Sequence, residues 1–536
     1  MWTQASDPLG NAFLSALAGA IPVFFLFWAL AIRRLKGHVA AVWATSIAIA
    51  VAIVVFGMPA PLAIASTLQG ALYGLFPIGW IVVAAVFLYR VTVESGQFAV
   101  IRDSIASLTA DRRLQALLIA FSFGAFLEGA AGFGAPVAIS AAMLVGLGFE
   151  PIYAAGLCLI ANTAPVAFGS IGTPILVAAG VTGIDVMLIS QMVGRQLPVV
   201  SLIVPLWLVV VMSGWKGARE VWPAALVSGG SFALAQWWSS NYLGPMLPDI
   251  ISSLVSIVCL VAFLRVWRPS TTFRFEKETM PSRPHALPAL PALAWAWSPF
   301  IVLTILVANW GMRPVKALLD TTTFTFAFPV IHNALVLPGS GTPAPAVFTF
   351  NWLSATGTAT MLAGIVAVAI ARMHPATALA IFGRTLASMA APLLTIASVL
   401  GLAYIGNSSG ITRAMGVALA STGALFPLFS PVLGWLGVFM TGSDTSSNAV
   451  FGRLQTVSAE HTGMSPILAI ASNSSGGVTG KMISPQSIAV ACAATGLVGH
   501  ESSLFRFTLR HSLLLLAIMA LITWLQATVL SWMVPG

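Results

Sequence analysis

The feature that most constrains this sequence is a series of long apolar runs with almost no charged residues. A helix of roughly 20 mostly apolar residues spans the hydrocarbon core of a bilayer, where helices and closed barrels alone satisfy their backbone polar groups. The runs here are too long and continuous for alternating barrel strands. Charged residues make up 7% of the 536 residues, whereas an ordinary soluble domain is about a quarter charged. The sequence therefore predicts an all-α, polytopic integral membrane protein.

The clearest predicted spans are the uninterrupted apolar ranges, at 10–32, 39–57, 63–88, 196–213, 221–238, 250–264, 298–311, 349–371 and 512–533. The stretches 114–195 and 377–500 are also apolar, but Gly, Pro, Ser and Asn interrupt them. Counting each of these two stretches as several spans gives about 12 to 14 transmembrane helices.

Basic residues suggest how the spans are oriented. They are found in the segments 33–36, 89–113 and 214–220, whereas the loops 58–62 and 239–249 have none. Because Lys and Arg are retained on the cytoplasmic side, we expect the N-terminus outside. Arg506 and Arg510, which precede the last span, predict an external C-terminus as well, although Arg313 and Lys316 on the predicted outer side do not fit the rule.

The chain is predicted to consist of two transmembrane halves, 1–264 and 298–536, joined by a basic, Pro-rich cytoplasmic linker at 265–297. Each half contains one copy of a weak repeat, at 114–177 and 431–488. Asn162-Thr163, Gly169 and Pro174 in the first copy recur with the same spacing as Asn473-Ser474, Gly480 and Pro485. Chance similarity in Gly-rich sequence is the alternative. The surrounding charges suggest that the copies enter the membrane from opposite faces, and such inverted repeats with broken or re-entrant helices are typical of secondary transporters.

Two acids within the broken stretches are candidate proton carriers. Glu128 lies in an apolar, Gly-rich segment without a basic neighbour in the sequence. An ionised carboxylate there must pair, face water or take up a proton, and a purely structural hydrogen bond from the neutral acid is the alternative. Asp444 lies among hydroxyl and amide side chains, where it could carry a proton, bind a cation or cap a helix N-terminus.

The candidate substrate-binding residues are polar side chains near these acids, namely Asn162, Thr163, Ser443, Thr445, Ser446, Ser447, Asn448, Asn473 and Ser474, together with the cations Lys481 and Arg195. Lys481 could hold a carboxylate or snorkel to the surface. Arg195 could recognise a carboxylate or lie at a cytoplasmic helix end. The candidate helix-break residues are Gly129, Gly132, Gly134, Gly442, Gly476, Gly477 and Gly480.

The same blocks resemble the bacterial L-lactate permease family. The similarity is specific in 123–137, 162–169, 434–448 and 476–487, and it is weakest in 269–297 and 313–348. This resemblance implies a multi-pass protein of the bacterial inner membrane that imports lactate, and often glycolate or other 2-hydroxy acids, by proton symport. It implies a small carboxylate as substrate, lipid as surroundings and the proton as coupling ion, without a metal or another cofactor.

Two other functions stay open at this point, besides an anion channel, which only an absence of uphill transport would favour. One is a sodium-coupled carboxylate symporter, in which Asp444, Ser446 and unwound carbonyl groups bind the cation. The other is a membrane-embedded hydrolase that uses Ser443 and Asp444. A hydrolase needs a base near its nucleophile, and no His is close to Ser443 in the sequence. We therefore expect a carrier and not an enzyme.

Overall fold

The computed structural model describes residues 1–5, 7–33, 35–132, 135–275, 288–336 and 343–536. The prediction of an all-α, multi-spanning protein is confirmed. Among the described residues, ten helices are long and apolar enough to cross a membrane, and one bent helix pair brings the number to 11. One of the ten, α11 (Val186–Tyr242), is interrupted at Gly214, where the backbone leaves the helical region. The predicted spans 196–213 and 221–238 are the two parts of this helix.

The helices of the N-terminal half are α1 (Ala12–Phe27), α2 (Gly37–Val54), α3 (Ala60–Tyr73), α4 (Trp80–Glu94), α5 (Gln97–Ala106), α6 (Arg112–Gln115), α7 (Gly124–Ala130), α8 (Ala135–Gly146), α9 (Pro151–Ala161), α10 (Gly169–Thr182), α11 and α12 (Pro248–Val266). Wider helical turns at Trp28–Ile32, Gly74–Gly79 and Ala116–Phe123 extend or connect them, and Val166–Phe168 is a tight turn.

The helices of the C-terminal half are α13 (Leu290–Gly311), α14 (Arg313–Asp320), α15 (Thr356–Ile370), α16 (Pro375–Ser409), α17 (Ile411–Leu419), α18 (Phe426–Thr441), α19 (Asp444–Thr462), α20 (Pro466–Lys481), α21 (Pro485–Thr495) and α22 (Glu501–Ala527). Two of these differ from the sequence prediction. The stretch predicted to be interrupted from 377 onward begins with a continuous helix, α16. The predicted span 349–371 is helical only from Thr356, because its first residues belong to a strand.

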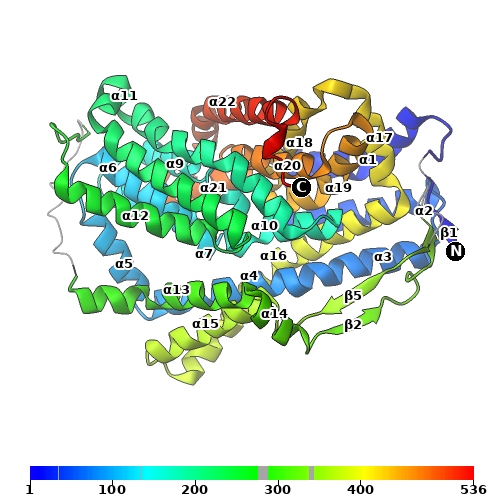
Figure 1. Ribbon diagram of the computed structural model, residues 1–536, viewed down its shortest axis with the longest axis horizontal. Helices are drawn as coiled ribbons and strands as arrows, with labels where there is room; N and C mark the ends of the chain where they lie inside the picture. The colour runs from blue at the N-terminus through cyan, green and yellow to red at the C-terminus, as the bar shows by residue number, and fades with distance from the viewer. Residues whose placement is uncertain (6, 34, 133–134, 276–287, 337–342) are drawn as a thin grey trace.

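Short strands occur in the segment where the family resemblance is weakest. β2 (Phe324–Ala327) pairs antiparallel with β5 (Val347–Phe350), with Phe324 opposite Phe350. β3 (Leu335–Val336) lies between β1 (Trp2–Thr3) and β4 (Pro343–Ala344). Phe, Thr and Val alternate in β2 and β5, and these residue types favour strands. In Figure 1 the strands and the N-terminus lie at one end of the molecule, while α5, α6 and the turn within α11 lie at the other.

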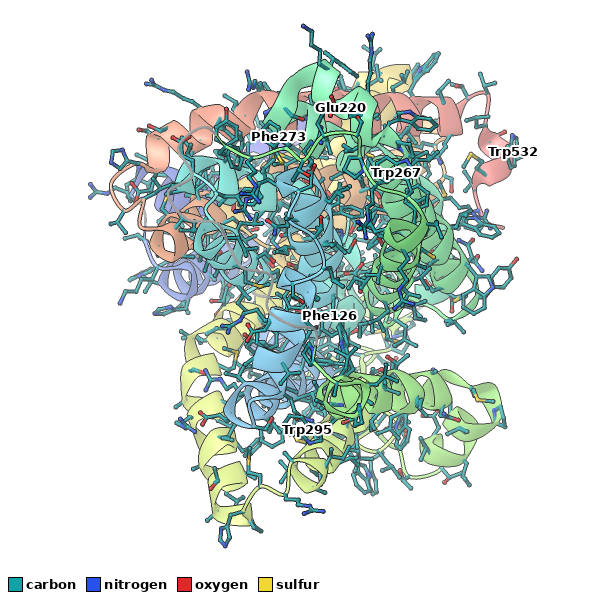
Figure 2. All side chains as sticks on the ribbon, turned by 90° about the vertical axis from the view of Figure 1, so that its left-hand side faces the viewer. Phe126, Glu220, Trp267, Phe273, Trp295 and Trp532 are labelled. Carbon is teal, nitrogen blue, oxygen red and sulfur yellow. The ribbon has the colours of Figure 1, made fainter. Side chains whose placement is uncertain are left out.

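The helices form two groups. In the first, α16 contacts α2, α3 and α4, and α15 contacts α4 and α13. The second contains both predicted repeats with α11, α12 and α22. Aromatic side chains join the groups: the ring centroid of Phe126 lies 4.6 Å from that of Phe300 and 5.1 Å from that of Trp297, both in α13. Figure 2 shows Phe126 deep in the molecule and Trp532 at its edge.

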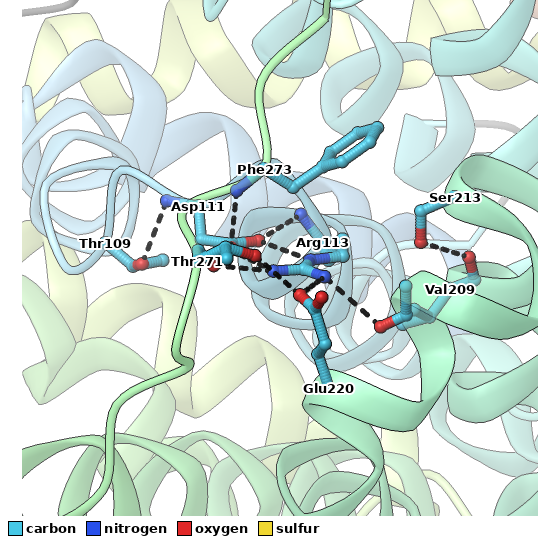
Figure 3. A network of polar contacts seen from close by, with 9 residues as sticks. Thr109, Asp111, Arg113, Val209, Ser213, Glu220, Thr271 and Phe273 are labelled. Atoms are coloured by element: carbon cyan, nitrogen blue, oxygen red, sulfur yellow. Dashed lines mark hydrogen bonds and ion pairs between the residues drawn. The ribbon is translucent and has the colours of Figure 1, made fainter.

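A charged network connects the linker to the helices (Figure 3). Arg113, only 1% exposed, donates to Asp111 Oδ2 at 2.8 Å and to Glu220 Oε2 at 2.9 Å. It also donates to the carbonyl oxygen of Thr271, and the backbone N–H of Phe273 donates to Asp111. Three chain segments therefore meet at one guanidinium group. Of the predicted linker 265–297, residues 276–287 lie outside the described residues, and α13 already begins at Leu290.

Candidate functional site

The predicted repeats are two pairs of broken helices. The chain breaks between α7 and α8 and between α9 and α10 in the first copy. In the second it breaks between α18 and α19 and between α20 and α21. The contacts between copies come in matching pairs, because α8 packs on α21 and α10 packs on α19. In chain order, α8 of the first copy corresponds to α19 of the second, and α10 corresponds to α21. Exchanging the two copies therefore converts one contact into the other, as expected for repeats related by a two-fold axis.

The break between α9 and α10 is sharp. These two helices are bent by 64° relative to each other. Ser170, Ile171 and Gly172 follow in succession with φ values of 45°, 56° and 73°, in the left-handed region. Two of these are not glycine, and such backbone persists only where the surrounding structure imposes it. The break thus places the backbone around Gly169 beside α7, where a side chain at position 169 would collide with Glu128.

Glu128 and Lys481 form a buried ion pair between the repeats. Glu128 lies near the end of α7 and is 3% exposed, and Lys481 is the last residue of α20 and is 8% exposed. Lys481 Nζ donates to Glu128 Oε1 at 2.8 Å, and Asn162 Nδ2 donates to Oε2 at 2.9 Å. A buried acid can pair with a cation, face water or take up a proton, and the structure shows that Glu128 is paired. Lys481 therefore does not snorkel to the surface.

Asp444 lies at the N-terminus of α19, in the first turn after Ser443. Ser443 caps this helix by accepting a hydrogen bond from the backbone N–H of Ser446 at 3.2 Å. Asp444 Oδ2 accepts hydrogen bonds from Ser474 Oγ and, at 3.5 Å, from Asn448 Nδ2. Its Oδ1 has no hydrogen-bond partner among the described residues. The carboxyl group is therefore hydrogen-bonded through one oxygen atom only, and the other oxygen is buried.

A cavity of about 950 Å³ lies against both acids. The buried lining residues include Glu128, Asp444, Lys481 and Ser170. It extends to the exposed residues Leu35, Lys36 and Gly37 between α1 and α2. The site thus combines one buried ammonium group, two carboxyl groups, several hydroxyl groups and the N-terminus of α19, which favours negative charge.

The candidate residues that line this cavity are Glu128, Gly442, Ser443, Asp444, Thr445, Ser446 and Lys481. Other candidate residues do not line the cavity and lie in the protein behind its wall. Asn473 Nδ2 donates to Asn448 Oδ1 at 2.8 Å, and Ser447 Oγ donates to the carbonyl oxygen of Gly434 at 3.2 Å. Thr163 is buried, and its hydroxyl group has no partner among the described residues. Arg195 is not brought to the cavity, because it donates to Asn241 Oδ1 and to the carbonyl oxygen of Met533.

The glycine predictions are partly wrong. Gly132 and Gly442 do lie at breaks, with φ of 60° and 68°, and Gly134 lies outside the described residues. By contrast, four glycines lie inside helices, at Gly129 in α7 and Gly476, Gly477 and Gly480 in α20. They allow close packing: a Cβ at Gly476 would lie 2.5 Å from the Cα of Pro431, and one at Gly477 would lie 2.6 Å from Asp444 Oδ1. The break follows α20 instead.

Sequence reasoning missed Asp249, the second residue of α12. It is 1% exposed, and its Cβ lies 2.7 Å from where a side chain on Gly129 would begin. The signal was an acid directly after Pro248 at the start of an apolar run, a position that resembles an ordinary helix N-terminus. The pairing of Glu128 with Lys481 also had no sequence signal.

Two features of the part of the chain that the structure describes bear on the metal and hydrolase alternatives. No group of three or more His, Cys, Asp or Glu side chains there could hold a metal ion. Ser443, the nucleophile of the hydrolase alternative, is engaged as the cap of α19.

The fold is similar to that in the crystal structure of the Alcanivorax borkumensis YdaH transporter. The TM-score is 0.50 at 16% sequence identity, covering 94% of this chain and 100% of that one. A polytopic helical protein whose broken helices surround a polar cavity with buried charges is a membrane transporter in its class.

The chain belongs to the L-lactate permease family, whose model matches residues 15–530. The L-lactate permease of Bacillus subtilis (strain 168) is 55% identical over 562 residues, and that of Escherichia coli (strain K12) is 52% identical over 549 residues, each covering 100% of both chains. The glycolate permease GlcA of Escherichia coli (strain K12) is 53% identical over 559 residues, covering 99% of each chain. The family resemblance seen in the sequence is confirmed.

Proposed function

We propose that this protein imports 2-hydroxymonocarboxylates, L-lactate and glycolate among them, together with protons across the bacterial inner membrane. The relatives named for lactate and for glycolate are each more than half identical to this chain. Lactate and glycolate share a carboxylate with a hydroxyl group on the neighbouring carbon. The site therefore has to recognise one negative charge and one hydroxyl group.

The cavity contains partners for both groups. The ammonium group of Lys481 is the buried cation among the described lining residues, and the N-terminus of α19 adds partial positive charge. Thr445 and Ser446 are hydrogen-bonding partners for the substrate hydroxyl. A single buried ammonium group matches a substrate with a single charge.

The observation that carries the proton-coupling proposal is the ion pair between Glu128 and Lys481 at the cavity. A substrate carboxylate that binds Lys481 takes that ammonium group from Glu128. Breaking a buried ion pair by removing one partner costs about 3–5 kcal/mol, and a proton on Glu128 removes that cost. Each bound anion therefore requires one proton, and Asp444 is the second acid through which a proton can pass.

This coupling also meets the electrical demand of uptake. Moving one negative charge inward against an inside-negative potential is opposed by about 2.3 kcal/mol per 100 mV. One proton per anion cancels this electrical term, and the pH gradient then drives accumulation. Movement of one repeat against the other would expose the site alternately to the two sides.

Uptake of labelled L-lactate into proteoliposomes tests the proposal. With acid outside, we expect accumulation above the external concentration without sodium, and loss of that accumulation when a protonophore collapses the gradient. Glu128→Gln should remain inserted and lose proton-driven accumulation. Accumulation that requires sodium and ignores the pH gradient would contradict proton coupling and favour the sodium symporter.

A further inference from the structure

Asp249 is a third buried acid, close to Glu128 and Lys481. Asp249 is 1% exposed, and neither oxygen of its carboxyl group has a hydrogen-bond partner among the described residues. It does not line the cavity, so the substrate does not provide a partner in this state.

The position of Asp249 is set by the glycine beside Glu128. Gly129 has no side chain, and any Cβ there would lie 2.7 Å from Asp249 Cβ and 3.2 Å from the backbone nitrogen of Ile250. This contact holds the start of α12 against the turn of α7 that carries Glu128. The absence of a side chain at Gly129 thus lets Asp249 lie close to the ion pair of Glu128 and Lys481.

The charged groups that act on Asp249 are Glu128 of α7 and Lys481 of α20. From the turn at Ala116–Phe123 and from α11, the groups that hydrogen-bond to α12 are the neutral hydroxyls of Ser122 and Ser228. Lys481 is already paired with Glu128. Among the described residues, no cation is therefore left to neutralise Asp249.

An ionised carboxylate in this position would have neither a counter-ion nor a hydrogen-bond donor. Burying an unpaired charge costs so much that the group binds a proton instead. Even the neutral acid has an O–H group without an acceptor here, and buried polar groups normally have a partner. The nearby acceptor that becomes available in another state is Glu128, once a substrate takes Lys481 from it.

We propose that Asp249 is the internal proton donor to Glu128, an inference that rests on the proposed function. When the substrate carboxylate binds Lys481, the O–H bond of Asp249 breaks as an O–H bond forms on Glu128. Asp249 is left as a carboxylate that accepts the Glu128 O–H as a hydrogen bond. A proton taken up from water then restores the acid. Each substrate anion is matched by one proton taken up.

Asp249→Asn tests this role, because the amide has nearly the same shape but cannot pass on a proton. We expect exchange of labelled for unlabelled lactate across the membrane, which needs no net proton transfer, to stay within about twofold of the wild type. Proton-driven accumulation should fall at least about tenfold, in the range lost with a proton-transfer group. Asp185→Asn, which changes the exposed cap of α11, is the matched control and should retain both.

Asp249→Ser, which is smaller than the natural side chain, repeats the test if the amide variant does not insert. Wild-type accumulation in either inserted variant would overturn the proposal, and loss of both exchange and accumulation in both variants would assign Asp249 to packing. A second readout is infrared difference spectroscopy on lactate binding, where the wild-type spectrum should contain a contribution from the Asp249 carboxyl group that is missing in Asp249→Asn. If the wild-type protein does not respond to a pH gradient, the proposed function itself fails. That result is distinguishable from failure of the Asp249 proposal, in which the wild type responds and the Asp249 variants respond equally.

Discussion

One ammonium group, that of Lys481, is paired with Glu128 and is also the group that we propose binds the substrate carboxylate. The group is 2.8 Å from Glu128 and also lines the cavity. An isolated ion pair in such a place is weak evidence for stability, since its attraction is offset by the cost of removing two charges from water. Its position at a cavity indicates use in binding.

Removal of the ammonium group should show how strongly the two residues depend on each other. We expect Lys481→Met to destabilise the protein by about 3–5 kcal/mol at neutral pH, because Glu128 is left buried without its cation. Glu128→Gln combined with Lys481→Met should recover most of that loss, since no uncompensated charge remains. Thermal unfolding of the purified single and double variants measures both effects. Equal stability of Lys481→Met and the wild type would show that the pair is not coupled.

The sequence identifies the acids but not their partners. Glu128 and Asp444 could be predicted because acids are rare in apolar runs and usually functional there. Lys481 was a candidate as a cation that could hold a carboxylate. It contacts Glu128 from the opposite half of the chain, and no local sequence pattern encodes that contact. Asp249 escaped notice because it lies beside Pro248 at a helix start, where acids are common. Burial, which sequence position alone does not give, distinguishes it.

At the scale of elements, glycine has two roles that look alike in the sequence. Gly442 ends α18 with a left-handed backbone, whereas Gly476 lies inside α20 and lets α18 approach closely. Both belong to Gly-rich polar stretches, so composition predicts that something unusual happens there but not whether the helix breaks or packs. The strands between Phe324 and Phe350 were also missed, since no element was predicted between the spans 298–311 and 349–371 and only the end of β5 falls in the second of these.

A substitution can separate the two roles of glycine. Gly476→Ala should destabilise the protein by about 1–3 kcal/mol, because the new methyl group would lie 2.5 Å from the backbone Cα of Pro431. In an open helix position the same change stabilises by up to about 1 kcal/mol. Gly383→Ala in α16, where no atom lies within 4 Å of the added Cβ, is therefore the matched control. A higher melting temperature for Gly476→Ala than for the wild type would show that α20 is not closely packed there.

At the scale of the whole molecule, the two repeats share one site. Glu128 comes from the first repeat, and Asp444 and Lys481 come from the second. A movement of one repeat against the other therefore changes the distance between the acid and its cation. In the proposed function, substrate binding, proton binding and that movement are linked through the same pair of side chains, which is the requirement for coupled transport.

The central claim is that Glu128 and the substrate compete for Lys481, and the pH dependence of lactate affinity tests it most directly. Equilibrium binding is measured on purified wild-type protein and Glu128→Gln over a pH range in which lactate stays ionised. If one proton is taken up per anion, wild-type affinity should fall about tenfold for each unit that the pH rises. The affinity of Glu128→Gln should be nearly independent of pH. A flat wild-type profile, or the wild-type slope in Glu128→Gln, would contradict the competition.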